Sequence, residues 1–341
     1  MMKKIFLTLI VAFISLSAIC KNRALLIGIG NYPDNSGWQH INSANDINII
    51  KSVLPSSFLV KSLVNQEATH KRIIDAILDL TTSAQPNDTV LIHFSCHGQQ
   101  IITDKVDEPD MLDEALVPYD AKSIKDKTYT GNHHLLDNEL GSLLDSLRKK
   151  IGEKGLVIVT LDACYSDSMN KAGEKKNNIV YRGGAEIFGI NDVDSILKEQ
   201  ILKNRKNVDT DTVYKLDNAS NLIIISACKT YQKNMELVID GKGYGSLSYC
   251  MYESFNEYGF NDPIVWMDSI MAKMHRYAYT QTPQIRNTIG YQYNSTTNTA
   301  PPQCPGFPPP TKFFSWQIIL LFSLIIILTF ACLIIWKRKK K

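Results

Sequence analysis

Short runs of apolar residues alternate with longer segments in which apolar residues recur every three or four positions, from residue 23 to residue 279. A continuous apolar run is typical of a strand buried on both faces, and the wider spacing is typical of an amphipathic helix. The predicted strands cover residues 23–30, 58–64, 89–94, 155–161 and 222–226. The predicted helices cover 43–54, 136–147, 246–256 and 264–279, and a further helix begins after its N-cap, Thr69. This alternation predicts an α/β domain with a largely parallel central sheet and helices on both faces.

The N-terminal end differs from this body. Residues 1–20 combine a basic start, a short apolar core and small residues, which predicts a secretory signal peptide cleaved after Ser17 or Cys20. Acylation of Cys20, as in a lipoprotein, is a weaker alternative because Ile19 is not the small residue that such a site needs. We therefore expect the domain to begin at residue 21.

The C-terminal end is also distinct. Residues 313–336 are uncharged and apolar on every face, which predicts one C-terminal transmembrane helix. The stretch from Trp316 to Trp336 would span ~31 Å as a helix, close to the thickness of a bilayer core. The alternative, a buried core helix, does not explain the basic residues 337–341, which predict a cytoplasmic tail.

Residues 301–312 are rich in proline and predict a stiff stalk between the membrane and a domain at 21–300. Together with the signal peptide, this predicts a single-pass membrane protein whose domain lies outside the cytoplasm, in the periplasm or the extracellular space. Within that domain, residues 166–220 are rich in Lys, Asn and Gly and predict a long, partly flexible insertion.

The composition narrows the possible partners. A content of 44% hydrophobic and 21% charged residues excludes a disordered or fibrous chain. The formal net charge is +3, but basic residues concentrate at both ends, so the domain itself is slightly acidic. Because a phosphate backbone attracts clustered Lys and Arg, nucleic acid is excluded as a partner.

The seven cysteines do not form a disulfide scaffold, and two of them, Cys20 and Cys332, lie in the terminal segments. The other five are Cys96, Cys164, Cys228, Cys250 and Cys304. They are an odd number with no Cys-x-x-Cys pair, so neither a zinc site nor a redox dithiol is indicated, and we expect one to remain a thiol.

Two of the predicted strands are followed directly by residues that can take part in catalysis. His97 follows the third strand and Cys164 follows the fourth. Ligands collect at the carboxyl ends of parallel strands, and a thiol becomes a good nucleophile beside an imidazole. The backbone N–H groups of Gly98 and Cys164 could stabilise an oxyanion. The spacing indicates a Cys–His dyad for acyl transfer, although spacing alone also fits two ordinary buried residues.

The segments around these residues resemble a known family. His93-Phe-Ser-Cys-His-Gly-Gln99 and Asp162-Ala-Cys-Tyr-Ser166 resemble the two catalytic motifs of the caspase-fold (caspase/hemoglobinase) cysteine peptidases, in particular the metacaspases and their bacterial relatives, the orthocaspases. Three further segments match in the family's order: Ala44-Asn-Asp46, Asp113-Glu-Ala-Leu-Val-Pro-Tyr-Asp120 and Ile224-Ile-Ser-Ala-Cys228.

The resemblance implies a role for each matching residue. His97 would be the general base and Cys164 the nucleophile of a cysteine endopeptidase. Asp46, Ser95 and Asp162 would line an acidic S1 pocket, so that protein or peptide substrates would be cleaved after Arg or Lys.

The resemblance implies no required cofactor. Calcium activates some members of the family, but here only Asp113 and Asp137 keep a carboxylate at the ligand positions, whereas Asn138 and Lys171 do not. These two are weak calcium candidates, because calcium needs several oxygen ligands.

The chain also departs from the family pattern. Cys96 stands where glycine is usual, and it could silence Cys164 by forming a disulfide with it in an oxidising compartment. The insertion carries basic residues at which the protein could cleave itself, including Lys171, Lys175, Lys176 and Arg182. Two alternatives to a peptidase stay open: a catalytically silent caspase-fold module that binds a partner at the cell surface, and a transpeptidase that uses the same acyl-enzyme.

Overall fold

The structure is a computed structural model that describes residues 22–103, 110–125, 127–165, 180–183, 186–204 and 215–293. The predicted signal peptide (1–20), stalk (301–312), transmembrane helix (313–336) and tail (337–341) lie outside the described residues. Within the described ranges, none of the helices has the length and apolar character that crossing a membrane requires.

A six-stranded sheet forms the centre of the domain, in the order β11-β8-β7-β3-β1-β2. Its strands are β1 (Asn22–Gly28), β2 (Phe58–Val64), β3 (Thr89–Ser95), β7 (Leu156–Asp162), β8 (Asn221–Ser226) and β11 (Gln284–Asn287). The first five are parallel, and β11 joins the edge antiparallel to β8. The prediction of a largely parallel α/β sheet is confirmed, with the edge strand β11 as an addition.

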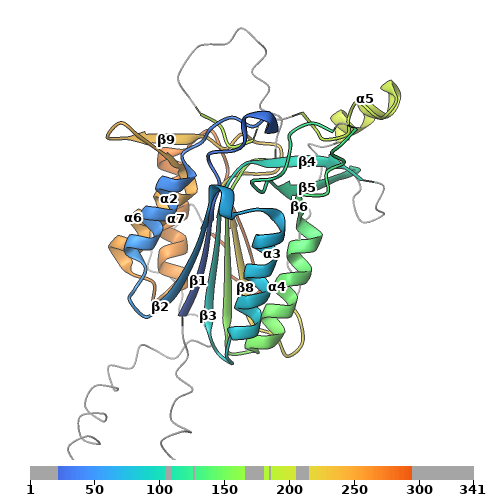
Figure 1. Ribbon diagram of the computed structural model, residues 1–341. Helices are drawn as coiled ribbons and strands as arrows, with labels where there is room; N and C mark the ends of the chain where they lie inside the picture. The colour runs from blue at the N-terminus through green and yellow to red at the C-terminus, as the bar shows by residue number, and fades with distance from the viewer. Residues whose placement is uncertain are drawn as a thin grey trace, which may run out of the picture. The chain divides into compact units, whose positions relative to one another are not determined.

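Helices cover both faces of this sheet (Figure 1). On one face lie α2 (Ser43–Val53), α6 (Ser246–Tyr258) and α7 (Pro263–Tyr277); on the other lie α3 (His70–Ser83) and α4 (Asp137–Ile151). The Thr69 hydroxyl accepts the N–H of Arg72 at the start of α3, as expected of an N-cap. All five helices coincide with helices predicted from periodicity.

Strand residues alternate between these two layers. Leu25 and Ile27 of β1 join one cluster with Ile73 and Ile77 of α3, while the opposite layer is centred on Trp266 of α7, whose side chain is fully buried. Because successive strand side chains point to opposite faces, an apolar run is what a strand between two helical layers requires.

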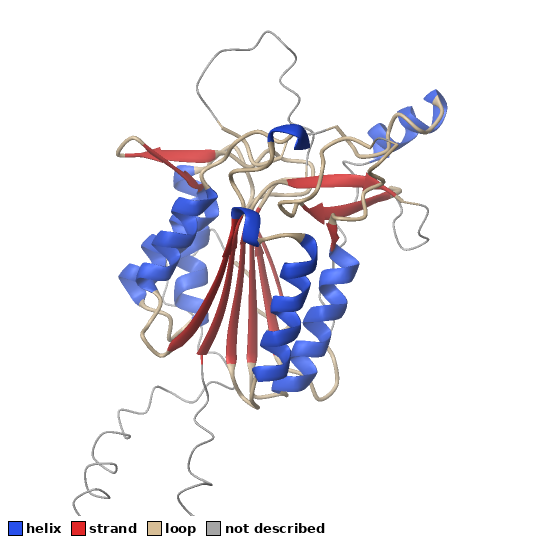
Figure 2. Ribbon diagram, viewed as in Figure 1, coloured by secondary structure: helices blue, strands red, loops and turns tan. Residues whose placement is uncertain are grey.

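Shorter elements lie beyond the carboxyl ends of the parallel strands, at the top of Figures 1 and 2. They are a three-stranded sheet of β4 (Gly98–Ile102), β5 (Leu112–Leu116) and β6 (Leu135–Leu136), a hairpin of β9 (Glu236–Ile239) and β10 (Lys242–Gly245), and helix α5 (Ser195–Asn204). The 3-10 turns η1 (Asp34–Ser36) and η2 (Asn65–Glu67) lie between the larger elements. Helix α5 is a regular element inside the predicted insertion 166–220.

The register of β3 and β7 sets the position of the predicted dyad. The two strands are parallel neighbours, and their last residues, Ser95 and Asp162, are paired. His97 and Cys164 each follow two positions later, so both leave the sheet at the same level on adjacent strands.

Candidate active site

His97 is buried, and aromatic rings and two hydrogen bonds fix its imidazole. The ring stacks on Trp38 with centroids 4.9 Å apart. Its Nε2 lies 2.9 Å from the carbonyl oxygen of Gln39, which can only accept, so Nε2 carries the proton. Its Nδ1 therefore has a lone pair and accepts the N–H of Gly183 at 2.8 Å.

The environment also keeps this imidazole neutral. Burial lowers the pKa of His97 to about 4, against the opposing effect of the hydrogen bond to Gln39. The imidazole is therefore neutral at neutral pH, the form in which a histidine can serve as a general base.

Cys164 is fully buried just past the end of β7. Its Sγ donates a hydrogen bond to the carbonyl oxygen of Gln232 at 2.9 Å. Gly98 packs against the Cys164 backbone so closely that an added Cβ would lie 2.8 Å from the Cys164 carbonyl oxygen. A side chain at position 98 would therefore displace the backbone that carries the thiol.

The peptide that joins Arg182 to Gly183 lies between the imidazole and the thiol. Gly183 donates its N–H to His97, and a Cβ at Gly183 would lie 3.0 Å from the Cβ of Cys164 and 2.4 Å from its carbonyl oxygen. Gly183 also has a φ of 144°, which glycine adopts without strain. The chain can therefore pass this close to Cys164 only with glycine at position 183.

The Arg182 side chain fills an acidic pocket beside the dyad. Its Nη2 donates to Asp46 Oδ2 at 2.7 Å and to Glu236 Oε1 at 2.8 Å. Its Nη1 donates to Ser95 Oγ at 2.5 Å and lies 4.0 Å from Asp162 Oδ1. The side chains of Arg182, Asp46 and Asp162 have no exposed area, and that of Glu236 is 2% exposed. The three predicted S1 residues thus meet around a guanidinium of the protein itself.

Hydrogen bonds from backbone and side-chain groups hold two of these carboxylates. Asp162 accepts the Asn234 side-chain amide at 2.7 Å on Oδ1, and the N–H and hydroxyl of Ser248 at 2.7 and 2.6 Å on Oδ2. Asp46 accepts the N–H of Gly245 on Oδ1 at 2.9 Å, and its Oδ2 accepts the Ser95 hydroxyl at 2.7 Å as well as the guanidinium. Such bonds lower the cost of burying charge and fix the orientation of each carboxylate.

Glu236 is a third carboxylate of the pocket, contributed by β9. Its Oε1 accepts the N–H of Asn42 at 2.7 Å and its Oε2 accepts the Asn42 side-chain amide at 2.6 Å. The sequence analysis missed Glu236, because it lies 54 positions from Arg182 and in no motif. It also did not place Arg182 in the pocket, although it named Arg182 as a cleavage candidate.

The charges in the pocket act on one another. Burial and the neighbouring Asp162 raise the pKa of Asp46 to about 6, even though Arg182 lowers it. Burial disfavours the charge on Arg182, yet Asp46, Asp162 and Glu236 together raise its pKa. The pocket is therefore negatively charged around one cation, as a site for a basic side chain should be.

The residues before Gly183 extend along the hairpin segment as an added strand. Tyr181 forms an antiparallel bridge with Met235, Arg182 N–H donates to the Asn234 carbonyl, and Glu236 N–H donates to the Val180 carbonyl, both at 2.9 Å. Extended peptides bind to sheet edges in this way, with alternate side chains in pockets. The segment 180–183 thus lies in the site as a bound peptide would.

The calcium candidates lie elsewhere. Asp113 is buried on β5, and Asp137 begins α4. Within the described ranges, no three His, Cys, Asp or Glu side chains gather as metal ligands. Asp104, Asp107 and Glu108, an acidic run near these residues in the sequence, lie outside those ranges.

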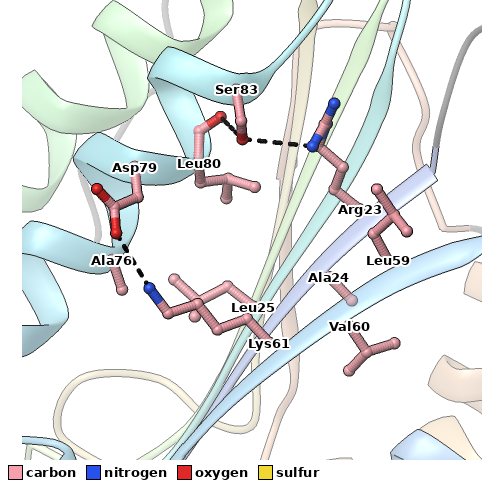
Figure 3. A pocket seen from close by; sticks show the side chains of 10 residues that line it. All are labelled: Arg23, Ala24, Leu25, Leu59, Val60, Lys61, Ala76, Asp79, Leu80 and Ser83. Atoms are coloured by element: carbon pink, nitrogen blue, oxygen red, sulfur yellow. Dashed lines mark hydrogen bonds and ion pairs between the residues drawn. The ribbon is translucent and has the colours of Figure 1, made fainter.

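A separate pocket of about 350 Å³ lies between β1, β2 and α3 (Figure 3). Lys61 and Asp79 form an ion pair across it at 3.2 Å. None of the predicted site residues lines this pocket, so the dyad and the acidic cluster remain the candidate site.

Comparisons with known proteins identify the family of this chain. The family model described as "Caspase domain" matches residues 21–292. Metacaspase-1B of Aspergillus terreus is 24% identical, over 64% of this chain and 59% of its own length. Metacaspase-1A of Aspergillus niger is also 24% identical, over 78% and 70%. Metacaspase-1 of Schizosaccharomyces pombe is 24% identical, over 68% and 59%.

A solved structure, protein GSU0716 from Geobacter sulfurreducens, shares the fold with a TM-score of 0.53 and 23% identity, over 78% of this chain and 93% of that one. The chain spans 59% to 70% of the length of the three metacaspases. The match to the family model covers most of the chain and includes the residues of the candidate site. The chain therefore belongs to the caspase domain family, whose members are cysteine-type peptidases, and within that family it is metacaspase-like.

Proposed function

We propose that the protein is a cysteine endopeptidase that cleaves after Arg or Lys, and that its own first substrate is the bond between Arg182 and Gly183. One observation carries the proposal: the Arg182 guanidinium occupies the acidic pocket while the next amide N–H meets the imidazole of His97 at 2.8 Å. A peptide substrate needs both contacts at once: its side chain is recognised by the pocket, and its leaving nitrogen must lie beside the imidazole.

The geometry supports a defined reaction order. The thiol proton of Cys164 passes to His97 Nδ1, and the sulfur attacks the carbonyl carbon of the P1 residue. The backbone N–H groups of Gly98 and Cys164 are proposed to stabilise the oxyanion. The imidazolium then protonates the leaving nitrogen, which is the atom that Nδ1 contacts at Gly183, and water hydrolyses the acyl-enzyme.

Arginine fits the pocket better than lysine. Nη2 of Arg182 binds Asp46 and Glu236 while Nη1 binds Ser95, so both nitrogens of the planar fork are used. A lysine ammonium is a single point charge and cannot meet both sets of partners in the same geometry. Arginine is therefore the preferred P1 residue in this proposal, with lysine accepted more weakly.

The uncut chain is proposed to be latent, since Arg182 occupies the pocket that a substrate would need. Hydrolysis after Arg182 would make Arg182 a free C-terminus and allow the segment 180–182 to leave the pocket.

We further propose that the domain lies outside the cytoplasm, after removal of residues 1–20, anchored by residues 313–336. The apolar character of these segments supports this. We propose that the hydrolysis requires no cofactor.

The first prediction concerns self-cleavage. The purified wild-type chain should yield a fragment with Gly183 at its N-terminus, seen by intact mass and N-terminal sequencing. Cys164→Ala and His97→Ala should leave the bond uncut, because each removes one member of the dyad. Arg182→Lys, which keeps the charge, should be cut at a rate reduced about 10-fold or more. Cleavage at Gly183 in the Cys164→Ala chain would overturn the proposal.

The second prediction separates latency from cleavage. Arg182→Ala removes the guanidinium from the pocket and with it the arginine after which the chain would be cut. We expect this uncut variant to hydrolyse a short fluorogenic peptide with P1 arginine, whereas Cys164→Ala, uncut with Arg182 in place, should not. A double variant, Arg182→Ala with Cys164→Ala, controls for contaminating activity. An intact, folded Arg182→Ala protein without activity would mean that chain cleavage itself, rather than emptying of the pocket, is needed.

The third prediction tests the role of Glu236. Glu236→Gln removes one of the two carboxylates that bind Nη2, so kcat/KM for a P1-arginine peptide should fall about 10- to 100-fold, as expected for one charge-assisted bond. The value of kcat/KM for the matched P1-lysine peptide should fall less, so the ratio of kcat/KM for arginine to that for lysine should decrease. Glu257→Gln, at an exposed position of α6, is the control. An unchanged ratio would show that Glu236 does not select between arginine and lysine at P1.

The fourth prediction is a pH dependence. Asp46 must be ionised to bind the P1 guanidinium, and with Arg182 in place its pKa is raised to about 6. Arg182 lowers this pKa, so its departure raises the pKa further, and kcat/KM of the processed enzyme should fall as the pH drops through about 6 or slightly above. The profile should be measured between pH 5 and 8. The residual activity of Asp46→Asn should lack this acidic decline.

A further inference from the structure

A second thiol lies beside the proposed nucleophile. The Sγ atom of Cys228 is 3.5 Å from the Gln232 carbonyl oxygen, the same oxygen that accepts the Cys164 thiol at 2.9 Å. Cys228 Sγ also lies 3.8 Å from the carbonyl oxygen of Ala163, the residue before Cys164. Two sulfur atoms that share one acceptor are close neighbours.

The sheet accounts for this proximity. β7 and β8 are parallel neighbours with Leu161 opposite Ser226, and Ala227 N–H donates to the Leu161 carbonyl at 3.0 Å. Cys164 and Cys228 therefore follow adjacent strands at almost the same level. Neighbouring strands are about 4.8 Å apart, which lies within the range of Cα separations that a disulfide spans.

The other described cysteines are placed differently. Cys96 lies in the hydrophobic cluster beneath α3 and α4, and Cys250 lies within α6. All four described cysteines, these two with Cys164 and Cys228, are thiols in the structure. From the sequence, Cys96 could form a disulfide with Cys164; in the structure, the sulfur that shares the Gln232 carbonyl with Cys164 is that of Cys228.

We infer that Cys228 is a resolving cysteine, which captures an oxidised Cys164 as a reversible Cys164–Cys228 disulfide. The oxidant would be a hydroperoxide. The Cys164 sulfur attacks its outer oxygen, the O–O bond breaks, and a sulfenic acid forms with release of an alcohol or water. The Cys228 sulfur then attacks the Cys164 sulfur, the S–O bond breaks, and the hydroxyl leaves as water with the Cys228 proton.

The disulfide would protect the nucleophile. Without a partner, a sulfenic acid is oxidised further to sulfinic and sulfonic acids, which thiols do not reduce. With the disulfide, two molecules of a reducing thiol restore both cysteines and leave as one disulfide of the reductant. This inference rests on the proposed function only in taking Cys164 as the reactive thiol, and it adds a reversible off state to the same site.

The test uses the 341-residue chain with Arg182→Ala, the uncut variant that the second prediction expects to be active. This protein and its Cys228→Ala, Cys96→Ala and Cys250→Ala derivatives are treated with hydrogen peroxide until activity is lost, then with dithiothreitol. Recovery is expressed relative to each protein's own untreated activity. Peptide mapping after alkylation identifies linked cysteines and higher oxides of Cys164.

We expect a linked Cys164–Cys228 peptide and recovery of most activity in the parent, Cys96→Ala and Cys250→Ala proteins. Cys228→Ala should form the sulfinic or sulfonic acid at Cys164 and recover about 10-fold less activity, because these oxides resist thiols. Equal recovery by Cys228→Ala, or a link from Cys164 to another cysteine, would overturn the inference.

Peptide mapping needs no turnover, so the two proposals can fail separately. A linked peptide in a protein that never hydrolyses a peptide would contradict the proposed function and support the cysteine pair. Full peptidase activity before treatment, with no linked peptide after inactivation by peroxide, would support the proposed function and contradict the cysteine pair.

Discussion

The arrangement of the active site depends on one buried cation among three carboxylates. The Arg182 guanidinium binds Asp46 and Glu236 directly and lies 4.0 Å from Asp162, with no part of its side chain exposed. Removing one partner from a buried ion cluster is strongly destabilising, so good geometry is required of every member. Because the carboxylates come from α2, β7 and β9, this one side chain connects three separate parts of the fold and holds its own backbone across the dyad.

The parallel sheet makes that arrangement possible. β3 and β7 end in register at Ser95 and Asp162, so two residues of the pocket and both residues of the dyad come from the same two strand ends. The strand-end residues point into the pocket, while His97 and Cys164, two positions later, lie beside Gly183. In the proposed enzyme, the pocket and the dyad are thus spaced by the length of one residue of substrate backbone.

The sequence was informative where the physics is local or strongly patterned. Apolar runs and helical spacing predicted the five parallel strands and five helices, because burial between two layers dictates both patterns. Strands β4, β5, β9 and β10 have four or five residues each and were missed, since so short a run carries little periodicity. Asp46 and Asp162 were expected in one pocket only through family resemblance. Glu236 and the docking of Arg182 depend on contacts between residues 54 positions apart, which no local pattern encodes.

The same carboxylates bind the internal segment and, in the proposed enzyme, the substrate, and this couples latency to recognition. When Arg182 leaves, Asp46 and Asp162 keep their hydrogen bonds from Gly245 and Ser248 but lose the cation that offsets their burial. The emptied pocket therefore takes up a proton or binds another cation, and a P1 arginine regains the interaction that was lost. A change that strengthens binding of the substrate side chain must strengthen binding of Arg182 as well. Only hydrolysis distinguishes the two, since it converts an arginine held by its own chain on both sides into a chain end that can move out of the pocket.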